Sequence, residues 1–302
     1  MGEQFCTVGD VELCYETFGD PSDVPLLLVM GLGTQMIAWR NDFCESLAAR
    51  GFHVIRYDNR DIGRSTHLRS ARPPTVRQML TRDRRAAAYT LDDMADDAAG
   101  LLDCLGIEAA HVVGASMGGM IAQMLAAGHP DRVLTLTSIM STTGHRLKGQ
   151  PALKVYPFFL AKRPKAKDEA IERIVKLFRV VGSPGFPRDE EDLRKLASDS
   201  WDRGDGDDAG SGRQLQAILA SGNRTAALRD VKAPTLVIHG KADKLVRPSG
   251  GRATARAIPG ARLVLIDGMG HDMPRGVWPR LIDLIAEHAA RVPASARDRA
   301  AA

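Results

Sequence analysis

A serine, an aspartate and a histidine each follow a short apolar run in this sequence. Together, residues of these three types can make the serine hydroxyl attack a carbonyl group. Ser116 lies in Gly114–Gly118 (Gly-Ala-Ser-Met-Gly), Asp243 follows the run Thr235–Gly240, and His271 lies just beyond the last such run. A serine hydroxyl is a poor nucleophile at neutral pH, so it needs a base within hydrogen-bond reach, and the base needs a group that orients it. We therefore identify Ser116 as the candidate nucleophile, His271 as its base and Asp243 as the orienting acid.

The segment around Ser116 matches the pattern Gly-x-Ser-x-Gly, with an apolar run before it and a helical pattern directly after it. That context favours a sharp strand-to-helix turn, which holds the serine in a backbone conformation that residues other than glycine normally avoid. Side chains at Gly114 or Gly118 would clash across such a turn. The alternative is a glycine-rich turn that carries a serine by chance, and it leaves the acid and the histidine at two later strand ends unexplained.

Other histidines and acids fit these roles less well. His239 is still inside an apolar run, so a buried core histidine, or one that supports the acid, is the better interpretation. His111 stands at the start of the run before the serine, which places it at the opposite edge of the sheet. Asp267 and Asp272 are close in sequence to the candidate base but lie on its own loop. Asp243 is therefore the preferred acid.

The negative charge that forms on a carbonyl oxygen during attack needs two backbone N–H donors. One is expected from Met117, because the residue after the nucleophile opens a helix whose first N–H groups have no partner inside the helix. The second is expected from Leu32, in the loop Gly31–Gly33 that follows the run Leu26–Met30. A plain tight turn is the alternative for this loop, but its position at the same sheet edge favours the functional interpretation.

Segments with strand-like patterns alternate with helical patterns along most of the chain. The expected strands are Phe5–Val8, Val11–Thr17, Leu26–Met30, His53–Tyr57, the run before Ser116, Val133–Met140, Thr235–Gly240 and Arg262–Ile266. The expected helices are Met36–Arg50, Leu91–Leu105 with Thr90 as its N-cap, the segment after Ser116, Ser249–Ile258 and Val277–Ala290. This alternation predicts an α/β fold with a mostly parallel eight-stranded sheet flanked by helices. Parallel strands bring their carboxyl ends to one edge, so the three candidate residues converge there.

The alternation stops between residues 142 and 230, where prolines break the chain repeatedly. Residues Ile171–Phe178 have the apolar spacing of an amphipathic helix, and the residues around Leu215 indicate a second one. The expected division of the chain is a core made of 1–141 and 231–291, a helical cap inserted at 142–230, and a disordered tail at 292–302.

Two stretches of the expected cap bear on ligands. The apolar run Val155–Leu160 and the Ile171–Phe178 face together form an apolar wall over the catalytic edge in our interpretation, although packing on the core is the simpler explanation for any single residue. The acidic run Asp202–Asp208 lacks the spacing and the distal glutamate of a calcium loop. We therefore interpret it as a solvated loop and expect neither a metal nor a cofactor.

Composition excludes several classes of function. The 302 residues are 44% hydrophobic and 26% charged, as in ordinary globular domains, and a net charge of +4 is too small to indicate binding to nucleic acid or to an anionic membrane. No apolar run reaches membrane-spanning length, and the first residues lack a signal-peptide pattern. Cys6, Cys14, Cys44 and Cys104 show no metal or redox spacing and are interpreted as free buried thiols. The sequence thus predicts a cytoplasmic enzyme that acts on a small molecule. It gives no indication of the oligomeric state.

Four segments together resemble the α/β-hydrolase family over essentially the whole chain. They are Gly31–Gly33, Gly114–Gly119, His239–Asp243 and Gly268–His271. The order serine, acid, histidine along the chain is the one that this family uses. Val29–Gly31 and Arg56–Ser65 are further similar to the aclacinomycin methylesterase group, whose members cleave a methyl ester on a bulky polyketide. Two departures from most of the family fit this group: Met30 replaces a histidine, and Asp61 replaces a glycine.

The resemblance implies a serine carboxylesterase that works through an acyl-enzyme intermediate on a small-molecule ester, without a cofactor. Because the expected cap offers apolar residues, we expect a preference for methyl esters of sizeable apolar acids. One alternative is a C–C bond hydrolase of ring-cleavage diketones, which shares a Gly-x-Ser-Met-Gly-Gly turn, although Gly31–Thr34 lacks the proline usual there. The alternative from another class is a ligand-binding receptor that keeps the three residues but turns over slowly.

Overall fold

The computed structural model describes residues 2–71, 75–81, 84–160, 164–204 and 209–292. Its strands form one sheet in the order β1-β2-β4-β3-β5-β6-β7-β8. The pairs β1–β2 and β2–β4 are antiparallel, and the later pairings are parallel. The strands are β1 (Gln4–Val8), β2 (Val11–Phe18), β3 (Val24–Val29), β4 (Phe52–Tyr57), β5 (Ala110–Ala115), β6 (Val133–Ile139), β7 (Thr235–Gly240) and β8 (Arg262–Ile266). The predicted α/β fold with a mostly parallel eight-stranded sheet is confirmed.

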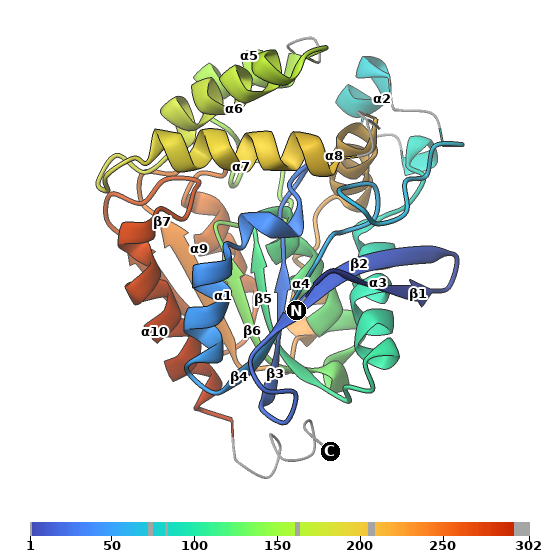
Figure 1. The fold of residues 1–302 in the computed structure, drawn as a ribbon, viewed down its shortest axis with the longest axis vertical. Coiled ribbons are helices and arrows are strands. Elements are labelled where there is room, and N and C mark those ends of the chain that lie inside the picture. The colour runs from blue at the N-terminus through green and yellow to red at the C-terminus, as the bar shows by residue number, and fades with distance from the viewer. Residues whose placement is uncertain (1, 72–74, 82–83, 161–163, 205–208, 293–302) are drawn as a thin grey trace.

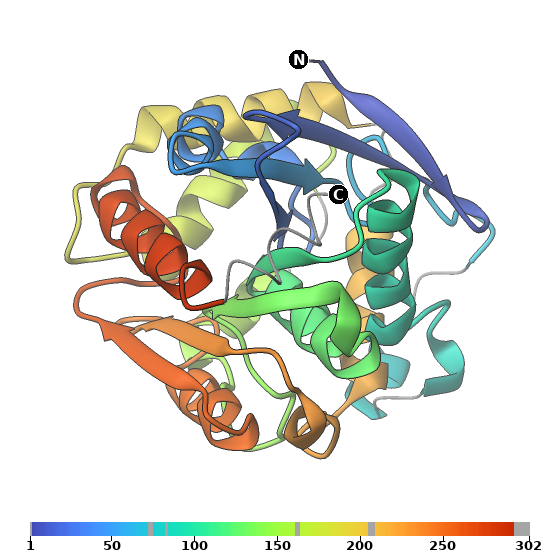
Figure 2. The same cartoon turned by 90° about the horizontal axis from the view of Figure 1, so that it is seen from below.

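Successive residues of the central strands point to opposite faces of the sheet, and helices cover both faces. In β3, Leu27 and Val29 belong to the apolar core on one face, whereas Leu26 and Leu28 belong to the core on the other. The first core lies against α3 (Leu91–Cys104), α4 (Met117–Gly128) and α9 (Ser249–Ala257), and the second against α1 (Asn41–Ala48) and α10 (Trp278–Ala289). Figure 2 shows these two helical layers. Burial on both faces explains why the strands are continuous apolar runs in the sequence.

The predicted helix Met36–Arg50 is two helices in the structure. A 3₁₀ turn, η1 (Met36–Ala38), is followed by α1, and Arg40 between them has extended backbone with φ −57° and ψ 148°. The break turns Trp39 into the core, where its ring stacks on Phe43 with the centroids 5.5 Å apart. Periodicity alone does not reveal this break, because the apolar residues on its two sides still follow a helical spacing.

Thr90 is the N-cap of α3, as predicted. Its hydroxyl accepts from the Asp93 N–H, and the Asp93 carboxylate accepts in return from the Thr90 N–H at 2.7 Å, which makes a capping box. The remaining short helices outside the segment between β6 and β7 are α2 (Val76–Thr81), η2 (Arg84–Ala86), η3 (Pro130–Arg132) and η6 (Arg275–Val277). Across the described ranges, no helix has both the length and the hydropathy needed to span a bilayer.

Between β6 and β7 the described residues form helices and loops but no strand. The helices are η4 (Leu153–Val155), α5 (Tyr156–Leu160), α6 (Lys167–Val181), α7 (Glu190–Arg203), α8 (Gly210–Ser221) and η5 (Ala227–Asp230). Figure 1 shows α5 to α8 together over one end of the sheet. Helix α6 contains the predicted amphipathic stretch, and α8 contains Leu215. The cap boundaries at 142 and 230 stay a prediction. Residues 205–208 of the acidic run, and all of the expected tail after residue 292, lie outside the described residues.

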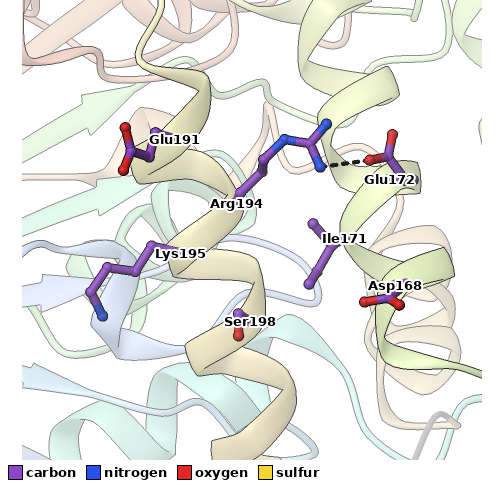
Figure 3. A pocket seen from close by; sticks show the side chains of 7 residues that line it. All are labelled: Asp168, Ile171, Glu172, Glu191, Arg194, Lys195 and Ser198. Atoms are coloured by element: carbon purple, nitrogen blue, oxygen red, sulfur yellow. Dashed lines mark hydrogen bonds and ion pairs between the residues drawn. The ribbon is translucent and has the colours of Figure 1, made fainter.

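Helix α7 is absent from the sequence-based prediction. Most of its residues are polar and Ala197 is the one buried residue in it. Leu193, Leu196, Ala197 and Trp201 do have helical spacing, and the sequence-based prediction missed this signal. Asp189 caps it, and an Arg194–Glu172 ion pair at 2.5 Å joins it to α6. Figure 3 shows the hollow of about 420 Å³ that side chains of α6 and α7 line. Most of the residues that line it are charged, and Ile171 and Ser198 are the uncharged ones.

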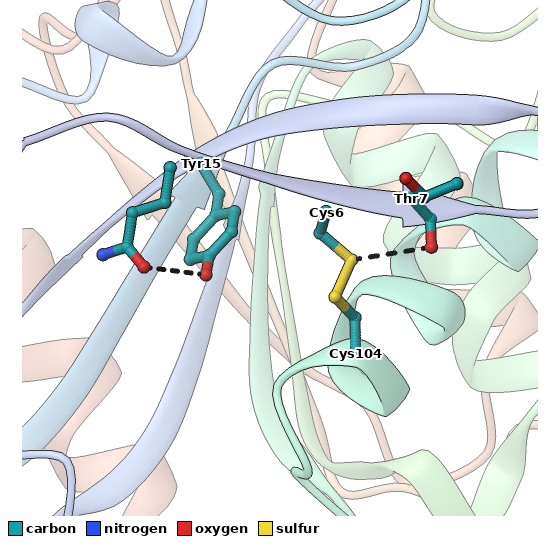
Figure 4. Close-up of a disulfide and its surroundings, with 5 residues drawn as sticks. Cys6, Thr7, Tyr15 and Cys104 are labelled. Atoms are coloured by element: carbon teal, nitrogen blue, oxygen red, sulfur yellow. Dashed lines mark hydrogen bonds between the residues drawn. A yellow bond between two sulfur atoms is a disulfide. The ribbon is translucent and has the colours of Figure 1, made fainter.

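Cys6 on β1 and Cys104 at the end of α3 form a disulfide, with their Cα atoms 6.4 Å apart (Figure 4). The interpretation of all four cysteines as free thiols was therefore wrong for this pair, whereas Cys14 and Cys44 are free and buried. The bonded residues are 98 positions apart, so their spacing carries no signal, and only the packing of β1 against α3 brings them together. The prediction of a cytoplasmic location rested in part on free thiols, and this pair does not give it that support.

The disulfide constrains the unfolded chain, because it closes a loop of 98 positions. We expect the double change Cys6→Ala and Cys104→Ala to lower the free energy of unfolding by about 2–4 kcal/mol, measured by urea unfolding. Thiol titration of the unfolded, unreduced protein is the control, and it should find Cys14 and Cys44 alone. Reactive thiols at all four cysteines would contradict the bond.

Candidate active site

The three candidate residues meet at the carboxyl edge of the sheet. Ser116 follows β5, Asp243 follows β7 and His271 follows β8. The Ser116 hydroxyl oxygen lies 3.0 Å from His271 Nε2, and His271 Nδ1 lies 2.7 Å from Asp243 Oδ2. The carboxylate is fully buried and the imidazole nearly so. A hydroxyl, an imidazole and a carboxylate therefore form one continuous hydrogen-bonded chain, the arrangement that activates a serine.

The backbone at Ser116 has φ 55° and ψ −117°, a region that residues other than glycine rarely occupy. Strand β5 ends one residue before it, and α4 begins one residue after it. A Cβ on Gly114 would overlap the Gly118 carbonyl, and a Cβ on Gly118 would overlap the Val29 carbonyl on β3. Both glycines are needed for the close approach of strand and helix, and the turn leaves the hydroxyl clear of the backbone. The sharp turn that the pattern predicts is present.

The Asp243 carboxylate is held by several donors besides the imidazole. Its Oδ1 accepts from the N–H groups of Leu245 and Val246, both at 2.9 Å. His239 Nε2 lies 2.7 Å from the Val246 carbonyl and 3.4 Å from Asp243 Oδ2. Because a carbonyl only accepts, this nitrogen carries the proton and faces the acid as a donor. Burial raises the pKa of Asp243, but His271 and His239 outweigh burial and hold that pKa below its ordinary value.

The loop that carries His271 is fastened by residues from the helical segment between β6 and β7. The His271 N–H donates to the carbonyl of Val181, the last residue of α6, at 2.8 Å. The Gly270 N–H donates to Ser183 Oγ, also at 2.8 Å. Sequence reasoning missed Ser183, because a serine after a helix has no pattern that distinguishes it from a solvated one. The position of the imidazole thus depends on the helical segment as well as on the sheet.

The competing acids and histidine lie elsewhere. The Asp267 side chain is 84% exposed and pairs with Lys241 at 2.8 Å. Asp272 hydrogen-bonds to Ser183, and burial raises its pKa against the opposing effect of that hydrogen bond. His111 is buried near the start of β5, at the far end of the strand from the turn. Geometry therefore favours the residues that the sequence singled out.

The loop after β3 lies directly against Ser116. A Cβ on Gly31 would sit 3.7 Å from the serine hydroxyl oxygen. Within the described part of the chain, the N–H groups of Leu32 and Met117 make no hydrogen bond to protein atoms. One of these donors follows Ser116 directly and the other lies in the loop that contacts it, and two such donors are what a developing oxyanion requires.

The loop Asp58–Ser65, after β4, supports the loop after β3 and contains one of the two departures noted in the sequence. Asn59 Nδ2 donates to the Met30 carbonyl at 3.0 Å, and the Met30 side chain is buried in the apolar core. Asp61 has φ 69°, and its buried carboxylate pairs with Arg213 of α8 at 2.6 and 2.8 Å. Methionine thus fills an apolar site. Aspartate gives up the conformational freedom of glycine and gains an ion pair with the helical segment.

A second buried arginine fastens the end of α7 to the same loop. Arg203 Nη1 lies 2.6 Å from Asp58 Oδ2 and 2.9 Å from Gln35 Oε1, and its Nε lies 2.6 Å from Glu3. The other oxygen of Asp58 accepts from the Met36 N–H at 2.7 Å. Sequence reasoning missed this cluster, because charged residues that pair across the fold have the same pattern as solvated ones.

The apolar wall expected from the run after residue 154 is only partly described. Val155 is fully buried, Tyr156 is 42% exposed, and Phe158 lines a second hollow, of about 550 Å³, among charged side chains of α6. The side chains of Phe159 and Leu160 lie outside the described ones. The lining of this hollow and of the one in Figure 3 includes none of the three candidate residues. Which apolar residues face the substrate stays a prediction.

Comparisons with known proteins identify the family to which this fold belongs. A family model described as alpha/beta hydrolase fold matches residues 24–274. Rhodomycin D methylesterase DauP of Streptomyces sp. (strain C5) is 34% identical over 95% of this chain and 98% of its own length. Rhodomycin D methylesterase DnrP of Streptomyces peucetius is 33% identical over the same shares.

Among solved structures, the enol-lactonase from Burkholderia xenovorans LB400 superposes with a TM-score of 0.75, over 95% of this chain and all of its own. Its identity of 23% makes this a likeness of fold alone. The family match and the two relatives each extend over most of the sequence. This chain therefore belongs to the α/β-hydrolase family.

Proposed function

We propose that this protein, a carboxylesterase by its family and its relatives, cleaves methyl esters of bulky apolar carboxylic acids through Ser116, His271 and Asp243. The hydrogen-bonded chain that joins these three side chains carries the proposal. The two relatives are named methylesterases, which supports a methyl ester as the bond that is cleaved. The C–C hydrolase alternative has weaker support, because neither relative has a name of that kind.

In the first half-reaction, Ser116 Oγ attacks the ester carbonyl while His271 Nε2 takes the hydroxyl proton. Asp243 holds the other imidazole nitrogen and stabilises the imidazolium that forms. The Leu32 and Met117 N–H groups stabilise the negative oxygen of the tetrahedral intermediate. The intermediate then breaks its bond to the alcohol oxygen, which receives the proton from Nε2 and leaves as methanol. An acyl group remains on Ser116.

In the second half-reaction, water replaces the alcohol. His271 Nε2 takes a proton from the water as its oxygen attacks the acyl carbonyl. The second tetrahedral intermediate releases Ser116 Oγ, which recovers its proton from Nε2, and the carboxylic acid departs. The cycle is complete with these side chains, and no cofactor enters it.

In this proposal the helical segment 142–230 is a cap over the catalytic edge and binds the acid portion of the ester. Apolar residues of this segment supply binding energy remote from the scissile bond. Such energy raises the rate when it helps to place the carbonyl against the nucleophile. In this proposal the alcohol portion contributes little binding energy and is small, methyl above all.

Replacement of Ser116 by alanine removes the nucleophile without disturbing the turn, since alanine is smaller than serine. We expect Ser116→Ala to reduce kcat for ester hydrolysis by at least about 10⁴-fold while circular dichroism and unfolding stay as in the wild type. A fluorophosphonate should label Ser116 and no other serine. Residual activity close to that of the wild type would refute the assignment of the nucleophile.

The two nearby aspartates give a matched pair for testing the acid. Asp243→Asn should favour the wrong imidazole tautomer and lower kcat by roughly 10⁴-fold. Asp267→Asn is the control, because it changes only an exposed ion pair with Lys241 and should leave kcat nearly unchanged. If the change at 267 proves the more damaging one, the acid has been misassigned.

The substrate preference is tested by comparing kcat/KM for the methyl ester of a naphthoic acid with that for methyl acetate. We expect the naphthoate ester to be preferred by at least about tenfold, because its rings bury more apolar surface than a methyl group does. A vinylogous diketone of the ring-cleavage type belongs in the same panel. Faster cleavage of methyl acetate, or of the diketone, would reject this substrate class, and the diketone result would favour the C–C hydrolase.

A further inference from the structure

Helix α8 places one uncharged polar side chain, Gln214, between two loops of the catalytic edge. Gln214 is completely buried. Its Oε1 accepts from the Gly33 N–H at 2.8 Å, and its Nε2 donates to the Arg60 carbonyl at 2.8 Å. The helix also approaches closely here, since a Cβ on Gly33 would lie 2.8 Å from Ser211 Oγ. One side chain thus joins the loop after β3, the loop after β4 and the helical segment.

The turn that Gln214 contacts is the one that carries the Leu32 N–H. The Thr34 N–H donates to the Gly31 carbonyl at 3.3 Å, and Thr34 Oγ1 donates to the Leu32 carbonyl at 3.1 Å. Gly33 has φ 63°, so the turn needs glycine at this point. The peptide groups on either side of Leu32 are therefore held by hydrogen bonds. The Leu32 N–H makes no hydrogen bond within the described residues, and the neighbouring Gly31 contacts Ser116.

We propose that Gln214 is a positioning residue for ester hydrolysis: its hydrogen bond to Gly33 fixes the turn and aims the Leu32 N–H at the forming oxyanion. The inference rests on the proposed function. An oxyanion donor is effective only within about 2.7–3.1 Å of the negative oxygen, so a small shift of the turn weakens it. Such a donor stabilises the transition state more than the bound ester, and its misplacement therefore lowers kcat more than it raises KM.

A primary amide suits this position because both of its ends are used. The oxygen pairs with one buried backbone donor, and the nitrogen pairs with one buried backbone acceptor. An apolar side chain of the same length would leave both backbone groups unpaired, and the turn would shift to find other partners. A carboxylate would keep the bond to Gly33 and lose the one to Arg60.

The test compares Gln214→Met, which removes both hydrogen bonds, with Gln214→Glu, which keeps an acceptor for Gly33. With the naphthoate methyl ester we expect Gln214→Met to lower kcat by about 10- to 100-fold and to change KM by less than about threefold. Gln214→Glu should retain more of kcat. The rate of Ser116 modification by a fluorophosphonate should fall in parallel with kcat, because the phosphoryl oxygen occupies the same donors.

Ser221→Ala is the matched control on the same helix. Ser221 Oγ accepts from the Leu91 N–H at 2.9 Å, so this change removes a hydrogen bond between α8 and the core away from the turn. It should lower the free energy of unfolding by about 1 kcal/mol and leave kcat and the fluorophosphonate rate unchanged. If Gln214→Met does not fold, Gln214→Asn replaces it, since its shorter side chain cannot reach Gly33 and the same loss of kcat is expected.

A kcat for the Gln214 variant within about twofold of the wild type, or a loss no greater than that of Ser221→Ala, would overturn the inference. Failure of the proposed function has a different signature. In that case the wild type does not cleave the esters, or the fluorophosphonate does not label Ser116. Labelling of Ser116 and normal ester cleavage by the wild type, combined with a normal Gln214→Met variant, would reject the positioning role alone.

Discussion

The backbone turn at Ser116 is the constraint on which the rest of the site depends. A positive φ at a residue with a side chain costs about 1–3 kcal/mol and persists only when the surroundings enforce it. Here β5 and α4 meet so closely that neither Gly114 nor Gly118 has space for a Cβ. This one turn lifts the hydroxyl from the backbone and exposes the Met117 N–H beside it. In the proposed mechanism, the base, the acid and the second donor are arranged around the hydroxyl that this turn positions.

The parallel sheet brings them to that point, and this part of the structure is predictable from sequence. Asp243 and His271 each follow an apolar run, and parallel strands end at a common edge. The meeting of Ser116, His271 and Asp243 therefore follows from local patterns and from topology, with no knowledge of side-chain contacts. The same reasoning predicts the eight strands and Thr90 as the N-cap of α3, because each depends on residues within one segment.

The features that escaped prediction are contacts between segments distant in sequence. Helix α7 has four apolar residues at helical spacing, but most of its residues are polar, and a charged pair joins it to α6. The disulfide joins residues whose spacing has no meaning outside the folded sheet. Ser183 and Arg213 are polar residues on helical or loop segments, where solvent exposure is the ordinary expectation. In each case the partner is specified by tertiary packing, which a single sequence does not display.

The contacts of Arg213 bear on what the helical segment does. Its guanidinium and the Asp61 carboxylate are both almost entirely buried, at 2% and 0% exposure. Movement of α8 away from the loop would break this ion pair and expose both charges to water. Helix α8 is therefore joined to the loop after β4 by a buried ion pair. Asp61 couples the loop after β4 to that helix. The buried ion pair accounts for an aspartate at a position whose positive φ favours glycine.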